Sequence, residues 1–69
     1  MQKLSARNIL AGNIKEIRKG ATTSHVLLDI GGATLTASIT NESVEELGLA
    51  VGKPAYGVIK ASDVMIGTD

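Results

Sequence analysis

The stretch SHVLLDIGGATLTASI, residues 24–39, decides the fold that the sequence predicts. Two alternating apolar and polar runs flank Gly31-Gly32, a pair that suits the positive-φ positions of a two-residue hairpin turn. Pairing Ile30 with Ala33 sets the register. One face of the hairpin is then apolar and forms the expected core, with Leu28 opposite Leu35 and Val26 opposite Ala37. The other face carries three pairs, Asp29 with Thr34, Leu27 with Thr36, and His25 with Ser38.

Short segments on both sides of this hairpin extend the β pattern. Residues 8–20, NILAGNIKEIRKG, fit neither a strict period of two nor a helix, so Gly12 predicts a bent or bulged strand. Residues 54–61, PAYGVIKA, and 62–67, SDVMIG, predict one or two further strands, with Gly57 where a barrel strand must bend. The sequence thus predicts an all-β unit of five short strands.

The segment TNESVEELG, residues 40–48, predicts a single short helix. Thr40 can cap the free N–H groups of the first turn, and Gly48 stands where the glycine after a helix belongs. Val44 and Leu47 face the same way. A helix of about two turns is unstable alone in water, so it must dock across the sheet or at one end of a barrel.

The size and composition of the chain indicate an oligomer. A chain of 69 residues forms one domain at most, and such a domain buries too little apolar surface for a comfortably stable monomer. Cysteine is absent and His25 is the only histidine, so neither disulfides nor a zinc site can supply stability. Association of aliphatic surfaces into a homo-oligomer is the remaining source.

Charge and motif content argue against several classes of function. Seven Lys and Arg residues balance seven Asp and Glu residues, and Tyr56 is the only aromatic residue, so we expect no nucleic-acid groove. No signal peptide or membrane span is visible, which predicts a cytoplasmic protein without a membrane partner. The sequence also lacks a nucleophile with a base, a paired-carboxylate site and a phosphate-binding loop, so we expect no enzyme.

Three segments are candidates for an anion site. Ser5 and Arg7 would share a face if their segment is extended, although a solvated N-terminal arm explains them equally well. Thr40 and Ser43 lie near the unpaired N–H groups of the helix start, where the alternative is a plain cap and where Glu42 could occupy the same groups. Lys60 ends an apolar run and could meet an anion, or it could simply extend into water.

Taken in order, four segments resemble the molbindin, or Mop, family of small molybdate-binding proteins. They are SARN (5–8), GNIKEIRKG (12–20), SITNESVEELGL (38–49) and GKPAYGVIKASDVMI (52–66). The resemblance covers nearly the whole chain and implies that residues 1–69 form a single Mop domain of the TOBE type. It implies a five-stranded barrel related to the oligonucleotide-binding fold, with one short helix. Free-standing members assemble as a hexamer, a trimer of dimers, with oxyanions bound between subunits.

The resemblance also implies a set of site residues. By matching position, one subunit would supply Ser5, Ala6, Arg7, Lys60 and Ala61, and its neighbour would supply Thr40 and Ser43. Ala61 stands where a related regulator has a hydroxyl, so only its backbone N–H can serve. The loop around Lys19 and Gly20 is the candidate for a second kind of oxyanion site near the threefold axis.

The implied ligand is molybdate or tungstate, bound as a dianion and not as a metal cation. Lys60 and Arg7 can neutralise its charge, while hydroxyl and N–H groups donate the remaining hydrogen bonds. Two roles stay open. The chain could store molybdate for molybdenum homeostasis, or it could sense the ion and pass the signal to a partner protein.

Overall fold

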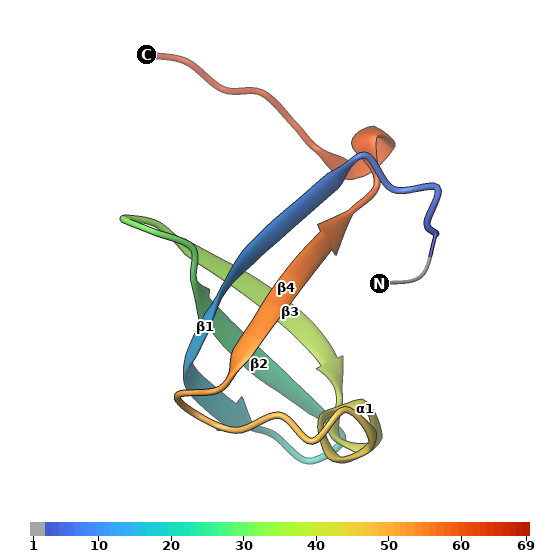
Figure 1. The fold of residues 1–69 in the computed structure, drawn as a ribbon, viewed down its shortest axis with the longest axis vertical. Helices are drawn as coiled ribbons and strands as arrows, with labels where there is room; N and C mark the ends of the chain where they lie inside the picture. The colour runs from blue at the N-terminus through green and yellow to red at the C-terminus, as the bar shows by residue number, and fades with distance from the viewer. Residues whose placement is uncertain (1–2) are drawn as a thin grey trace.

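The computed structural model describes residues 3–69 as a four-stranded antiparallel sheet with one short helix. The elements, in chain order, are β1 (Asn8–Lys19), β2 (Thr23–Asp29), β3 (Thr34–Thr40), α1 (Asn41–Glu46), β4 (Pro54–Ile59) and a 3₁₀ turn (Ala61–Asp63). The strand order across the sheet is β3-β2-β1-β4. The sheet curls into a half-barrel, with α1 at one end and the start of β1 and the end of β4 at the other (Figure 1). Between residues 3 and 69, no helix is long and apolar enough to cross a membrane.

The hairpin of β2 and β3 has the predicted turn and register. Gly31 and Gly32 have φ angles of 88° and 86°, and the N–H of Ile30 donates to the carbonyl of Ala33 at 3.0 Å. The cross-strand partners are those that the sequence predicts, from His25 with Ser38 to Asp29 with Thr34. The turn type and the apolar alternation both act over a few residues, which is why the pattern alone determines this register.

The predicted apolar face forms the core. Val26 and Leu28 are 6% and 5% exposed, and Ile14 from β1 joins them at 1%. Further apolar side chains pack against these three from β1, β3, α1 and the segment after α1; among them are Ile17, Leu35, Ile39, Val44 and Leu49. The core is small because it lies on only one face of a single curved sheet.

Strand β1 is bulged as predicted, but at a different residue. Its register with β2 shifts between Ile14 and Glu16, which places the extra residue at Lys15 and not at Gly12. Gly12 has another function, because a Cβ there would collide with the carbonyl oxygen of Asp29. A Cβ at Gly57 would instead overlap the tip of the Leu35 side chain from β3. Gly12 permits close packing of β1 against β2, and Gly57 leaves space for Leu35 from the opposite edge of the sheet.

The prediction of a fifth strand at residues 62–67 is wrong for the single chain. Ala61–Asp63 form a 3₁₀ turn, and the rest of the tail has no regular structure. Met65 and Ile66 are 92% and 91% exposed, and the tail leads away from the sheet (Figure 1). A strand requires a hydrogen-bonding partner strand, and the tail has none among residues 3–69. The fold is therefore a half-barrel of four strands and not the closed five-stranded barrel that we expected.

Both ends of α1 follow the sequence prediction. Thr40 is the N-cap, and its hydroxyl oxygen accepts a 3.0 Å hydrogen bond from the N–H of Ser43. After the helix, Gly48 has a φ of 63°, its N–H donates to Glu45, and the N–H of Leu49 donates to Val44. This pair of bonds is a Schellman motif. It turns the chain back so that Val44 and Leu49 both pack against the core.

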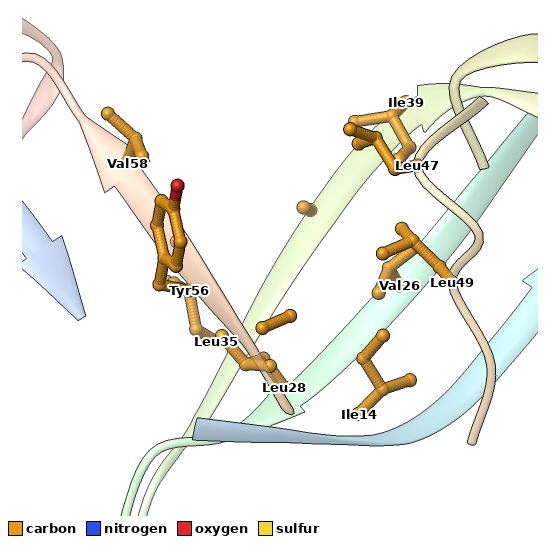
Figure 2. Close-up of a pocket in the computed structure, with 12 residues that line it drawn as sticks. Ile14, Val26, Leu28, Leu35, Ile39, Leu47, Leu49, Tyr56 and Val58 are labelled. Atoms are coloured by element: carbon orange, nitrogen blue, oxygen red, sulfur yellow. The ribbon is translucent and has the colours of Figure 1, made fainter. Parts of the chain in front are cut away.

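The concave side of the half-barrel is an open apolar groove of about 290 Å³. Figure 2 shows Tyr56 and Val58 of β4 on one side of it and Ile39, Leu47 and Leu49 on the other, with open space between them. Leu47 remains 68% exposed even though it faces this groove. Within residues 3–69 no strand pairs with both β3 and β4, so the two edges of the sheet are not hydrogen-bonded to each other.

Candidate functional site

The antiparallel pairing of β1 with β4 brings Arg7 and Lys60 to the same end of the sheet. Asn8 and Ile59 are the last paired residues of these strands. Arg7 directly precedes that pair and Lys60 directly follows it. Both cationic residues are exposed. Arg7 and Lys60, 53 positions apart in the sequence, therefore lie at the same end of the fold. Their two segments, considered one at a time, do not predict this placement.

The segment Ser5-Ala6-Arg7 is not the extended strand that our face-sharing argument required. The chain bends at Ser5 and at Arg7, and regular pairing begins only at Asn8. Ala6 is half-buried, whereas Ser5 is exposed. The β1–β4 pairing, and not strand alternation, is therefore what brings this segment close to Lys60.

The backbone around Lys60 is held by the turn that follows it. Lys60 has an extended conformation with φ −67° and ψ 137°. Its carbonyl accepts a 2.9 Å hydrogen bond from the N–H of Asp63, and the carbonyl of Ala61 accepts a 3.2 Å bond from Val64. The lysine side chain therefore projects from a defined point between a strand and a 3₁₀ turn.

Neither Arg7 nor Lys60 has a carboxylate partner within the part of the chain that the structure describes. The one ion pair found over residues 3–69 joins Arg18 to Glu16. The hydrogen bond from Arg18 lowers the pKa of Glu16 below its ordinary value. Arg7 and Lys60 thus form a local positive site in a chain whose net charge is zero.

Thr40 and Ser43 cap the start of α1 through two mutual hydrogen bonds. The hydroxyl of Thr40 donates to Ser43 Oγ at 2.8 Å while it accepts from the Ser43 N–H. Glu42 is exposed, and within the described chain its carboxylate accepts no hydrogen bond from the N–H groups of the helix start. Two of these N–H groups have other acceptors, because the Asn41 N–H donates to the carbonyl of Thr22 at 2.9 Å and the Ser43 N–H donates to Thr40.

The two groups of predicted site residues do not meet within one chain. Arg7 and Lys60 lie at the end of the sheet where β1 begins. Thr40 and Ser43 lie at the start of α1, at the end of the sheet where β1 finishes (Figure 1). Strand β1 has 12 residues, and a strand advances by about 3.3 Å per residue. A single anion cannot touch both groups of one chain.

A second polar hollow, of about 340 Å³, includes the predicted residues Lys19 and Gly20. Its other lining residues, which the sequence reasoning missed, are Arg18, Thr23 and His25. The β1–β2 register places Arg18 opposite His25, so correct pairing of these strands was the signal that could have found them. The N–H of Gly20 is not free to bind an anion, because it donates to the carbonyl of Thr23 at 2.8 Å.

Asn41 is a structural residue that the sequence reasoning also missed. Its side-chain amide donates to the carbonyls of Gly20 and Ala21 at 3.1 and 3.3 Å, and its oxygen accepts from the buried hydroxyl of Ser24. These contacts attach the start of α1, and with it Thr40 and Ser43, to the β1–β2 turn. An asparagine inside a short helix gave no sequence signal for this role.

Comparison with known proteins gives a consistent family. Residues 4–66 match the TOBE domain. The chain is 44% identical over 68 residues to a probable molybdenum-pterin-binding protein of Haemophilus influenzae, covering 97% of this chain and 99% of that protein. Its fold superposes on a molybdate-binding protein from Sporomusa ovata with a TM-score of 0.92 and 34% identity, covering 97% of this chain and all of the other.

A third relative is the cytoplasmic molybdate-binding protein ModG in a form with molybdate bound. The TM-score is 0.93 with 46% identity, covering 99% of this chain and 49% of the ModG chain. All three relatives are named as binding proteins, and the match extends over almost every residue of the present chain. The chain therefore belongs to the Mop/TOBE-domain family of molybdenum-pterin- and molybdate-binding proteins, whose molbindin-type members are not enzymes.

Proposed function

We propose that this chain binds molybdate, and also tungstate, at sites between the subunits of a homo-oligomer. One observation carries the proposal: the Asn8–Ile59 pair brings Arg7 and Lys60, two cations without a carboxylate partner in the described chain, to one end of the sheet. The molybdate-bound relative ModG supports the choice of ligand. Ser5, Ala6, Arg7, Lys60 and Ala61 form one half of the proposed site.

The chemistry of these groups suits a tetrahedral dianion. Arg7 and Lys60 together carry two positive charges, which match the two negative charges of molybdate. Hydroxyl and backbone N–H groups complete the shell without adding charge. Phosphate is partly protonated at neutral pH, and in a shell that contains only donors its P–OH group has no acceptor, at a cost of about 1–3 kcal/mol.

Thr40 and Ser43 of a second subunit supply the other half of the proposed site. They lie too far from Arg7 and Lys60 of their own chain to share its anion. We therefore propose a closed assembly of identical chains, a hexamer built as a trimer of dimers, in which each interface joins unlike ends of two subunits. The 69 residues act as one domain in each subunit.

The exposed surface of the chain supports association. The chain exposes 5403 Å², whereas a compact monomer of 7.1 kDa exposes about 4,100 Å². Its radius of gyration is 12.6 Å, compared with about 11 Å for a compact domain of this length. A standard interface buries about 800 Å² per partner, so the excess is large enough for a stable contact.

The missing fifth strand fits the same assembly. Residues 62–67 have a strand-like sequence but lack a partner within the chain, while the sheet keeps two free edges. A second copy would offer the edge that the tail requires. Burial of Met65 and Ile66, both more than 90% exposed in the single chain, would add to the stability of the pair.

The hollow at Lys19 and Gly20 is the proposed second oxyanion site. Arg18, Lys19 and His25 line it, although Arg18 already pairs with Glu16. Because the Gly20 N–H is engaged in the turn, side chains would hold an anion there. We assign this site a lower affinity than the one at Arg7 and Lys60.

We propose storage of molybdate in the cytoplasm for molybdenum homeostasis as the cellular role, without a nucleic-acid or membrane partner. A sensing module that signals to a protein partner is the alternative. A pull-down from cells grown with and without molybdate separates the two roles. A stoichiometric partner that appears only with molybdate would favour sensing.

Isothermal titration of the purified protein with molybdate, tungstate and sulfate tests the binding function directly. Its mass in solution should be measured on the same sample. We expect an oligomer that binds molybdate and tungstate tightly and sulfate weakly. An oligomer that binds none of the three ions would contradict the proposed function while leaving the family and fold intact.

A further inference from the structure

The side chain of Asn8 joins the two strand ends that carry Arg7 and Lys60. Asn8 Nδ2 donates to the carbonyl of Ile59 at 3.2 Å, in a half-buried contact between residues 51 positions apart. Asn8 is the first residue of β1 and Ile59 is the last residue of β4. The bond therefore lies at the terminal residue pair of β1 and β4, next in sequence to both cationic residues.

The end of this ladder needs such a bond. Beyond the Asn8–Ile59 pair the strands are no longer paired, so they are free to fray at this point. Arg7 and Lys60 carry like charges and have no carboxylate partner in residues 3–69, so no ion pair holds the two strand ends together. An uncharged amide holds the ends together without competing for the cations or for the anion.

The other side of Lys60 is already held by a different contact. The Lys60 carbonyl accepts the hydrogen bond of the following 3₁₀ turn from Asp63. The Asn8 bond fixes the residue before Lys60, and this turn fixes the residues after it. Together they hold the backbone of Lys60 at a set distance from Arg7.

We propose that Asn8 is a positioning residue for oxyanion binding, which acts by holding the Arg7 and Lys60 segments together in the unbound protein. This inference rests on the proposed function, because it assumes that these two cations bind the oxyanion. A site held in its binding geometry loses less entropy when the ligand binds. Loss of the Asn8 bond should therefore weaken binding even though Asn8 does not itself contact the anion.

The chain offers a matched control at the other end of the same strand pair. Asn13 also belongs to β1, faces Pro54 of β4 and is exposed. The structure shows no side-chain hydrogen bond from Asn13 to any residue of the 3–69 range. Asn8→Ala and Asn13→Ala thus remove the same groups from the same strand, but only Asn8→Ala removes a link to the site.

The experiment measures molybdate affinity by isothermal titration for the parent, Asn8→Ala and Asn13→Ala, with the mass and melting temperature of each unliganded protein. We expect Asn8→Ala to bind about five- to tenfold more weakly and Asn13→Ala to match the parent. Asn8→Val, which favours the strand conformation and also lacks the donor, should reproduce the loss if Asn8→Ala folds poorly. Equal affinity of all variants would overturn the inference.

A double-mutant cycle with Lys60 separates positioning from general stability. If Asn8 acts through Lys60, the loss caused by Asn8→Ala should largely vanish when Lys60 is already replaced by Gln. If the two losses simply add, Asn8 has only a structural role and the inference is wrong. A parent protein that binds no oxyanion would instead contradict the proposed function, so the two failures are distinguishable.

Discussion

At the scale of single residues, Arg7 and Lys60 are distinguished by their shared position at one end of the β1–β4 pair, because every cation of residues 3–69 except Arg18 lacks a carboxylate partner. Arg18, on the same strand as the bulge, is neutralised by Glu16, and the same hydrogen bond raises the pKa of Arg18 above its ordinary value. Arg7 and Lys60 have no such contact within residues 3–69. An anionic ligand bound at this end of the sheet would supply the opposite charge that the chain itself does not.

Replacing either cation should weaken oxyanion binding sharply. We expect Arg7→Ala and Lys60→Ala each to lower molybdate affinity by about 10- to 100-fold, because a charged hydrogen-bond partner of the dianion is lost. Lys15→Ala is the matched control, since it removes one positive charge from the exposed bulge of β1. Titration calorimetry provides the affinities. Parent-like binding by both site variants would show that the anion binds elsewhere.

At the scale of elements, α1 is stabilised by contacts at its ends and with the rest of the fold, because it is too short to be stable alone. It has six residues, which is too few for a stable isolated helix. Thr40 and the Schellman motif satisfy its ends, and Asn41 attaches it to the β1–β2 turn. The position of Thr40 and Ser43 in the proposed site therefore depends on Asn41.

Removal of the Asn41 side chain should destabilise this end of the fold. Asn41→Ala leaves the buried hydroxyl of Ser24, 2% exposed, without its acceptor, and we expect a loss of about 1–3 kcal/mol in the free energy of unfolding. Urea denaturation of the parent, Asn41→Ala and the exposed control Asn13→Ala provides the comparison. A stability equal to that of the control would show that α1 is anchored by other contacts.

At the scale of the whole molecule, the half-barrel is incomplete on its own. The apolar groove between β3 and β4 is open (Figure 2), and the tail carries Met65 and Ile66 into solvent (Figure 1). Both features expose apolar surface that a monomer of this size would bury. The proposed oxyanion site also requires association, because it combines one end of the sheet of one subunit with the opposite end of the sheet of another.

Shortening the tail tests the contribution of residues 64–69 to the assembly. A chain that ends at Asp63 should show a lower mass in solution or dissociate at a higher protein concentration, because the apolar contacts of Met65 and Ile66 with another subunit are lost. A chain that lacks only residues 68–69 is the control. Light scattering over a dilution series measures the mass, and an unchanged mass for the shorter chain would exclude the tail from the interface.

The sequence by itself determined the features that depend on neighbouring residues. The Gly31-Gly32 turn, the register of β2 with β3, the Thr40 cap and the Gly48 terminus all follow from contacts within a few positions. The resemblance to the Mop family also came from the sequence, because segments such as SARN keep their order and spacing. The chain's membership of that family is confirmed by the match of residues 4–66.

Only the tertiary structure decided what depends on distant residues. The bulge lies at Lys15, the tail after Ala61 is not a strand, and the Asn8–Ile59 pair brings Arg7 and Lys60 to the same end of the sheet. Each outcome follows from which strands pair and which edges stay free, and alternation along one segment cannot encode the partner of that segment. A short-range pattern sets a local conformation, whereas the place of an anion-binding group depends on pairing across 51 positions of chain.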